Sequence, residues 1–168
     1  MLKKVRIQII TDRYEVQGSL YDAPTAPALF EQPAPEAEVE HTETTVEGRY
    51  HDSGDRISIG YKETELSGME GSSTSVSFQK SAPAIVSMLR DGSVKTALIF
   101  ERGKRHLCVY QTQIMPFEVC VFTKRVDNRL ETEGTLEMDY TVEIRGAQAE
   151  HTRLLLRVLP VFDSPSHS

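Results

Sequence analysis

Period-two alternation of apolar and polar residues, interrupted by glycine-containing turns, is the feature that most constrains this chain. Residues 136–144 (Leu-Glu-Met-Asp-Tyr-Thr-Val-Glu-Ile) carry an apolar side chain at every second position. Such a run points one set of side chains at a core and the other at water, as in a half-buried β-strand. Segments 5–9, 57–61 and 117–121 alternate in the same way, and no useful stretch has the 3.6-residue stripe of a helix. The chain is therefore predicted to be all-β.

Turn signals separate the predicted strands at the short spacing of sequential hairpins. Asp91-Gly92, for example, lies between the apolar segments 84–89 and 93–100, as expected for a tight hairpin turn. About eight to ten strands fit into the chain on this basis. Because short hairpin connections make sequence neighbours into spatial neighbours, we predict one closed antiparallel up-and-down barrel over residues 1–162, with a β-sandwich as the alternative.

Two segments lack this alternation. Residues 18–38 contain four of the 8 prolines, together with alanine and glutamate, a composition that does not supply a buried core. We predict a surface loop there, with a lid over the barrel mouth as the alternative. Residues 163–168 are predicted to be a disordered tail. The first ten residues alternate and predict a strand in place of a signal peptide.

Charge and composition narrow the function classes. The formal net charge of −6 argues against general nucleic-acid binding, and no stretch approaches the roughly 20 apolar residues of a membrane-spanning helix. Two cysteines, without a predicted signal peptide, predict a cytoplasmic protein. The histidines and cysteines show no metal-ligand spacing, and neither a phosphate-binding glycine loop nor a nucleophile elbow is present. We therefore expect no metal and no cofactor, and nothing specific supports an enzyme.

The two cysteines fall in a predicted hairpin. Pairing residues 106–112 with 116–122 puts Leu107 on the core face of that hairpin. The same register makes Cys108 and Cys120 cross-strand neighbours on the opposite face. Because a metal or redox role needs further ligands that are not nearby in the sequence, both cysteines are expected to be small apolar fillers.

The candidate site lies in residues 57–71. If the strand continues past Tyr61, its inner face is apolar at first and then ends in two carboxylates, Glu63 and Glu65. Glu70 follows in a glycine-containing turn. At a barrel mouth these carboxylates could bind a cationic or hydroxylated ligand, or share acid–base work. Alternatively, they pair with basic neighbours such as Lys104 or Arg105 and fix the barrel end, which is the commoner role for carboxylates at a rim.

These segments resemble, in order, the YwiB-like family of uncharacterised bacterial proteins. The most specific motifs are Tyr-Lys-Glu-Thr-Glu at 61–65 and Gly-Met-Glu-Gly at 68–71. Weaker pieces are found at residues 47–50, 100–101, 103–106, 110–112 and 136–140. The resemblance extends over about residues 39 to 159, with 3–10 as the first strand. It implies a cytoplasmic, calycin-type, lipocalin-like β-barrel whose relatives in fold bind small apolar molecules, and it implies no catalytic residue.

The chain departs from the family pattern at two places. Gln-Ile-Met-Pro follows Thr112, where the family tends to have Pro-Tyr-Gly at a tight turn, and segment 18–38 is longer and less acidic than the usual first loop. A site shared through either loop is therefore not implied.

We predict a non-enzymatic binding barrel that takes a small, partly apolar ligand at one end. The alternative is a protein-interaction module with a packed core and no ligand; an enzyme ranks third. Neither nucleic acid nor a membrane is an expected partner, and the sequence does not determine the oligomeric state. The predicted ligand-binding residues are Tyr61, Glu63, Glu65, Glu70, Arg105, Tyr110 and Tyr140.

Overall fold

The structure, a computed structural model of the chain, describes residues 2–16, 39–64, 71–144 and 149–160. The predictions for residues 18–38 and 163–168, and for Glu65 and Glu70, concern residues outside this part. The described residues form ten strands and no helix, and thus no helix that could cross a membrane. The strands are β1 (Leu2–Val16), β2 (Glu40–Asp52), β3 (Arg56–Lys62), β4 (Ser73–Gln79), β5 (Ile85–Asp91), β6 (Lys95–Glu101), β7 (Arg105–Gln111), β8 (Pro116–Arg129), β9 (Thr135–Ile144) and β10 (Ala149–Pro160).

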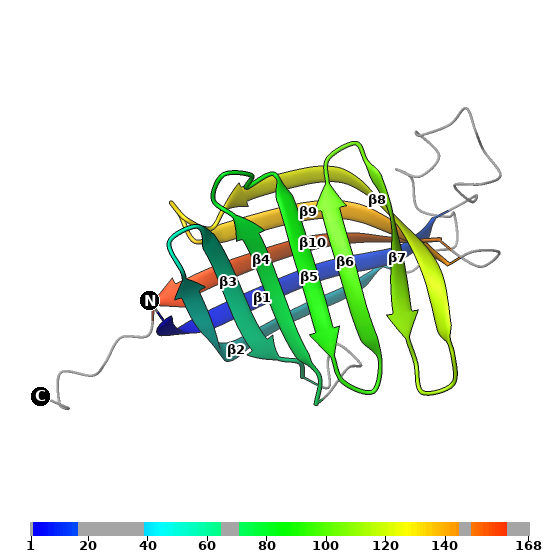
Figure 1. Ribbon diagram of the computed structural model, residues 1–168, viewed down its shortest axis with the longest axis horizontal. Coiled ribbons are helices and arrows are strands. Elements are labelled where there is room, and N and C mark those ends of the chain that lie inside the picture. Colours follow the sequence, from blue (N-terminus) through cyan, green and yellow to red (C-terminus); the bar gives the residue numbers. More distant parts are fainter. Residues whose placement is uncertain (1, 17–38, 65–70, 145–148, 161–168) are drawn as a thin grey trace, which may run out of the picture.

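The ten strands close into one barrel. Each strand pairs antiparallel with its neighbours in sequence, and β1 pairs with β10 to complete the ring (Figure 1). The prediction of an all-β, closed, up-and-down barrel is confirmed, at the upper end of the expected strand number.

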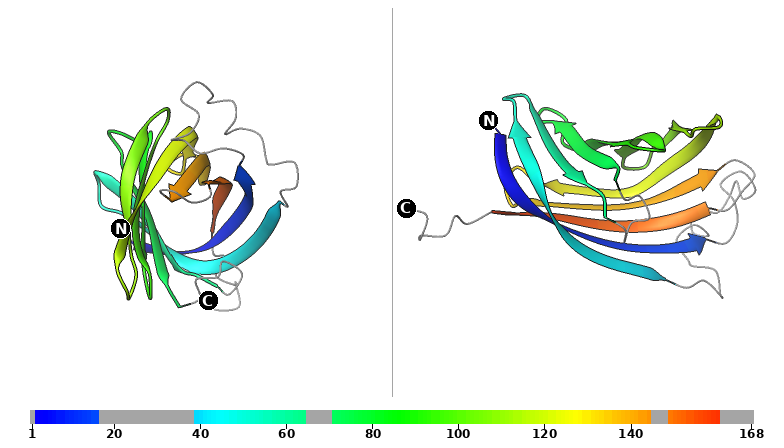
Figure 2. Two further views of the ribbon diagram at one scale, coloured as in Figure 1. Left: turned by 90° about the vertical axis from the view of Figure 1, so that its right-hand side faces the viewer. Right: turned by 90° about the horizontal axis from the view of Figure 1, so that it is seen from below.

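The barrel wall has two unlike halves. Strands β3 to β7 are seven residues long and form a flat layer, which lies nearest the viewer in Figure 1. The other strands are ten to fifteen residues long and curve around the opposite side (Figure 2). The cross-section is therefore flattened, with one planar outer face.

The core forms where the predicted alternation points inward. Leu136, Met138 and Tyr140 of β9 are buried, as are Ile7 and Ile9 of β1. Further fully or almost fully buried core side chains are Ile57, Ile59, Val76, Val86, Met88, Leu98, Phe100 and Leu156. Because fully burying one such side chain contributes roughly 1.5–3 kcal/mol, this inner lining is the main favourable contribution to folding.

The β7–β8 hairpin corrects a prediction. Its strands pair with Leu107 opposite Cys120 and Cys108 opposite Val119, one residue out of the predicted register. A one-residue shift exchanges the two faces of a strand, so Leu107 is 71% exposed whereas Cys108 is buried in the core. The two cysteines consequently lie on opposite faces of the sheet, and both are free thiols.

The shift has a local cause in the turn between the two strands. The Thr112 hydroxyl donates to the Met115 carbonyl at 2.7 Å and accepts from the Met115 backbone N–H at 3.1 Å. These bonds close a four-residue turn, which sets the register of the hairpin.

Strand β8 contains a β-bulge where it passes the end of β6. Its register against β9 shifts between Thr123 and Arg125. Before the bulge, Val119 and Val121 point into the core; beyond it, Val126 packs against the core. One extra residue thus changes which alternate positions of β8 face inward.

Candidate functional site

The inner wall of the barrel becomes polar towards one end. On several strands the inward-facing alternation that supplies the core continues into polar side chains, beside the end of β3 and the start of β2. We call this region the polar end. Its described members are Arg13, Tyr61, Glu63, Arg90, Thr96, Tyr110 and Tyr140.

Strand register brings most of this region together. Directly paired residues on neighbouring strands share a face, and one such row crosses the flat layer from β3 to β7. In order, the row is Tyr61, Thr74, Arg90, Thr96 and Tyr110. Five consecutive strands therefore supply one row of the polar end, and β1 and β9 add Arg13 and Tyr140.

Glu63 is the buried carboxylate of the polar end. Its side chain is only 6% exposed; Oε1 accepts a hydrogen bond of 2.6 Å from the Thr74 hydroxyl and lies 3.6 Å from Nε of Arg90. Such contacts compensate a buried polar group for the water that it loses. The pairing expected for a structural carboxylate is therefore present, with Arg90 as the cation where the sequence suggested Arg105.

The three tyrosines of the polar end differ in their electrostatic surroundings. Burial raises the pKa of Tyr61, and the nearby charge of Glu63 raises it further. Burial also raises the pKa of Tyr110 and Tyr140, while the positive charges of Arg90 and Arg13 act in the opposite direction. All three phenols are consequently neutral near pH 7 and able to donate a hydrogen bond.

An aromatic contact lies below the polar end. The ring of Phe100 lies 4.5 Å from that of Tyr140, centroid to centroid, with the planes tilted by 51°. Phe100 is fully buried and Tyr140 is 6% exposed. The polar residues of this end therefore adjoin an apolar part of the inner wall.

Several polar atoms at this end have no hydrogen-bond partner among the described residues. They include the Thr96 hydroxyl, Nε of Arg90 and Nε of Arg13. Thr96 is only 5% exposed, and Arg13 also binds Glu40 through Nη2 at 3.2 Å. Buried polar groups are normally paired, and an unpaired one costs about 1–3 kcal/mol. Nε of Arg90 has its ion-pair contact with Glu63 at 3.6 Å but no hydrogen bond, and all three atoms are almost inaccessible to solvent from outside the barrel.

Four of the seven predicted site residues lie together at the polar end: Tyr61, Glu63, Tyr110 and Tyr140. Arg105 does not join them. It is exposed on the outer face of β7, where its guanidinium lies 5.2 Å from the centroid of the Phe122 ring. This follows from the corrected register, because Arg105 shares a face with the exposed Leu107.

Sequence reasoning missed Arg13, Arg90 and Thr96, although a usable signal was present. Counting inward positions by twos from Val86 through Met88 reaches Arg90, and counting from Ile9 reaches Arg13. The inward alternation of both strands thus continues from apolar into polar residues.

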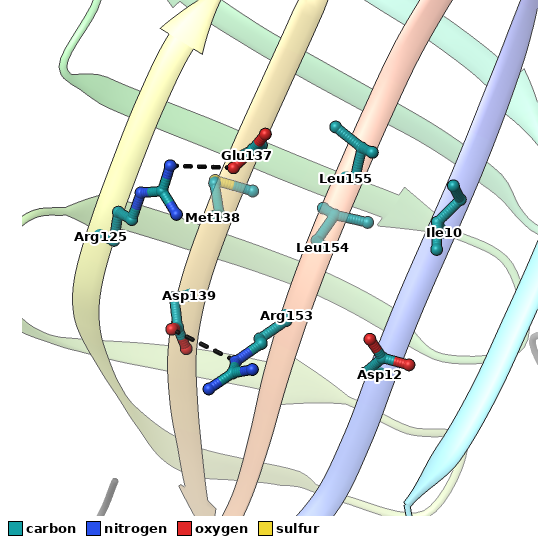
Figure 3. Close-up of a pocket in the computed structure, with 9 residues that line it drawn as sticks. All are labelled: Ile10, Asp12, Arg125, Glu137, Met138, Asp139, Arg153, Leu154 and Leu155. Atoms are coloured by element: carbon teal, nitrogen blue, oxygen red, sulfur yellow. Dashed lines mark ion pairs between the residues drawn. The ribbon is translucent and has the colours of Figure 1, made fainter.

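A hollow lies on the outer face of β8, β9, β10 and β1 (Figure 3). This groove, of about 420 Å³, is crossed by the ion pairs Arg125–Glu137 at 2.9 Å and Arg153–Asp139 at 3.6 Å. The charges in it largely compensate one another, and among the described residues no cluster suits a metal ion. Exposed pairs of this kind contribute little, about 0–1 kcal/mol each.

Fold and inner wall together define a closed ten-stranded β-barrel with polar groups gathered at one inner end. Residues 31–156 match the family model named Domain of unknown function (DUF1934). The chain belongs to this family. It also matches the crystal structure of the ywiB protein from Bacillus subtilis, with a TM-score of 0.63, 18% identity, and coverage of 93% of this chain and 94% of that one. No curated protein matches. The resemblance to the YwiB-like family is thus confirmed, and the structural match supports the barrel fold.

Proposed function

We propose that the barrel binds a small, partly apolar molecule whose polar group enters the polar end. The observation that carries this proposal is the set of buried polar atoms without a described hydrogen-bond partner, on the same inner wall as the Phe100–Tyr140 contact. An apolar surface with a few convergent polar groups is the usual character of a small-molecule site.

The chemistry of these atoms indicates what the ligand must supply. Nε of Arg90 and Nε of Arg13 are donors only, so the ligand needs a hydrogen-bond acceptor. The Thr96 hydroxyl can donate or accept. Because Glu63 already balances Arg90, a full negative charge is not essential. A carboxylate, hydroxyl or carbonyl oxygen on an apolar body fits best.

Three compounds that share a decyl tail and differ in the head group test this proposal. Decanol and decanoate offer oxygen acceptors, whereas decylamine is protonated near pH 7 and offers none. We expect the first two, and not the third, to raise the melting temperature. A ligand at 100 times its Kd adds about 2.7 kcal/mol. Native mass spectrometry of the purified protein should also show a copurifying mass of this class.

A variant pair ties the binding to the polar end. Thr96→Val removes the hydroxyl at nearly constant volume and should weaken decanol binding without lowering the stability of the free protein. Thr45, exposed on the outer face of β2, provides the control Thr45→Val. The proposal fails if no decyl compound changes the melting temperature and no mass copurifies, or if both variants affect binding equally.

A further inference from the structure

The outer face of the flat layer exposes a continuous group of apolar side chains. On β5 to β7 the exposed fractions are 71% for Leu107, 51% for Leu89, 43% for Val109, 40% for Ile85 and 37% for Ile99. Together with Ala97, which pairs with both Leu89 and Val109, we call these residues the apolar strip. Exposed apolar patches of this kind on soluble domains mark contact surfaces.

The surroundings of the apolar strip are also suited to a contact. The outward positions of β3 and β4 beside it hold small, uncharged residues: Ser58, Gly60, Ser73, Ser75 and Ser77. Charged residues lie towards the strand ends, with Lys95 at one end of β6 and Glu101 at the other. In the middle of the planar face (Figure 1) the outward positions of β5 to β7 carry no charge, whereas the Arg56 guanidinium of β3 donates a hydrogen bond of 2.9 Å to the Ser77 hydroxyl on β4.

Closure of the barrel determines how a partner can approach. At the apolar strip, β5 is hydrogen-bonded to β4 on one side and to β6 on the other, and β6 also pairs with β7 over its first three residues, so the middle of the strip is not a free sheet edge. A partner must pack its own surface face to face on this layer, as sheets do about 10 Å apart.

We propose that the apolar strip is a dimer interface between two copies of this chain. In this dimer a two-fold axis runs across the strands above Leu98, midway between Lys95 and Glu101 in β6. The operation stacks β6 on β6 in opposite directions. It places Lys95 of each copy opposite Glu101 of the other, so two complementary charge pairs border the apolar contact.

The same operation matches large residues with small ones at the centre of β5 and β6. Ile99 lies opposite Ala97 of the second copy. On β5, Leu89 and Ser87 are the register partners of Ala97 and Ile99, so Leu89 lies opposite Ser87 of the second copy. Large residues thus face small ones at both positions, which allows two flat sheets to interdigitate.

The size of the face suits a stable dimer. Five strands of seven residues cover roughly 24 Å by 24 Å at the usual strand spacing and rise. The accessible surface of such a face is on the order of the 800 Å² that one partner contributes to a standard interface.

Sedimentation velocity from about 1 to about 100 μM tests the proposal on the full chain. We expect a reversible dimer. Leu107→Glu should raise its Kd by at least about tenfold, because the most exposed member of the strip becomes charged at the contact. Leu2, 58% exposed on β1, provides the control Leu2→Glu, which should leave the Kd unchanged. Circular dichroism verifies that both variants are folded.

A charge exchange tests the orientation of the axis. Lys95→Glu and Glu101→Lys should each weaken the dimer, and the double variant should restore it, because the opposed pairs are then complementary again. Within one chain, Nζ of Lys95 lies 3.7 Å from Oδ1 of Asp91, and Oε1 of Glu101 lies 3.2 Å from Nε2 of His106. The single variants disturb these contacts too. Only an intermolecular pair between positions 95 and 101 predicts that the double variant recovers the dimer. A monomer at about 100 μM, an unchanged dimer in Leu107→Glu, or no recovery in the double variant overturns the proposal.

Discussion

Gly48 occupies a point in the barrel wall where no side chain fits. It lies on the inward face of β2, in register with Val5 of β1 and Tyr61 of β3. A Cβ at this position would be 2.3 Å from Cδ1 of Ile7 and 2.6 Å from the carbonyl oxygen of Gly60. Ile7 is fully buried, and the carbonyl belongs to a paired strand, so neither neighbour can move without cost.

The expected effect of Gly48→Ala follows from these contacts. Overpacking a filled core costs about 1–3 kcal/mol, and the strain on the Gly60 carbonyl places this variant in the upper part of that range. Gly60 itself is the matched control, since the atom nearest to its Cβ would be the Thr74 carbonyl oxygen at 3.9 Å. Gly60→Ala should be neutral or stabilising by up to about 1 kcal/mol. Neither glycine has a positive φ, so the comparison measures space and not backbone strain.

Urea unfolding followed by circular dichroism measures both variants. A double-mutant cycle adds the mechanism: Ile7→Val removes Cδ1 and should cost about 0.5–1.5 kcal/mol alone. Combined with Gly48→Ala it should cost less than the sum of the two, because one of the two clashes disappears. Wild-type stability of Gly48→Ala, or strict additivity in the cycle, would refute this reasoning.

Three further predictions concern titration and thiol chemistry. Burial raises the pKa of the tyrosines of the polar end, so the unfolding free energy should fall as pH rises above about 10. Tyr140→Phe should make that fall shallower. An unchanged slope would contradict a raised pKa of Tyr140. Burial acts to raise the pKa of Asp139, but the hydrogen bond and charge of His151 hold it below its usual 3.8. The contribution of this contact to the unfolding free energy is present above pH 3.8 and is lost as pH falls through the lower pKa of the folded state. The acid unfolding of Asp139→Asn should lack this pH-dependent loss. Because Cys108 and Cys120 lie on opposite faces and burial raises the pKa of both thiols, a reductant should leave the melting temperature unchanged, and thiol reagents should react rapidly only after unfolding.

How far the fold could be predicted depends on the contrast between the two faces of each strand. In β9, Leu136 and Met138 alternate with acidic residues, so the inward face was unambiguous. In β7, Leu107 and Val109 alternate with Cys108 and Tyr110, and both faces are largely apolar. Hydrophobicity therefore could not select a register there, and the hydrogen bonds of Thr112 decided it.

The candidate site was predictable on β3 and less so elsewhere. Tyr61 and Glu63 followed from continuing one strand, whereas their contact with Arg90 depends on pairing through β4. Arg90 is the cation of Glu63 because β3, β4 and β5 pair in order and place Tyr61, Thr74 and Arg90 in one row. Arg105 lies on the outer face of β7 and has no place in that row.

The bulge in β8 has a consequence for how the chain finds its native pairing. A regular strand can slide along its neighbour by two residues and still keep its apolar side chains inside. In β8 the inward positions before Thr123 and after Arg125 follow different phases, so a β8 strand paired without the bulge would turn the apolar side chains of one half outward. The extra residue therefore disfavours every β8–β9 hairpin that forms as a regular ladder, and the bulge has to form together with the pairing that lets the ring close.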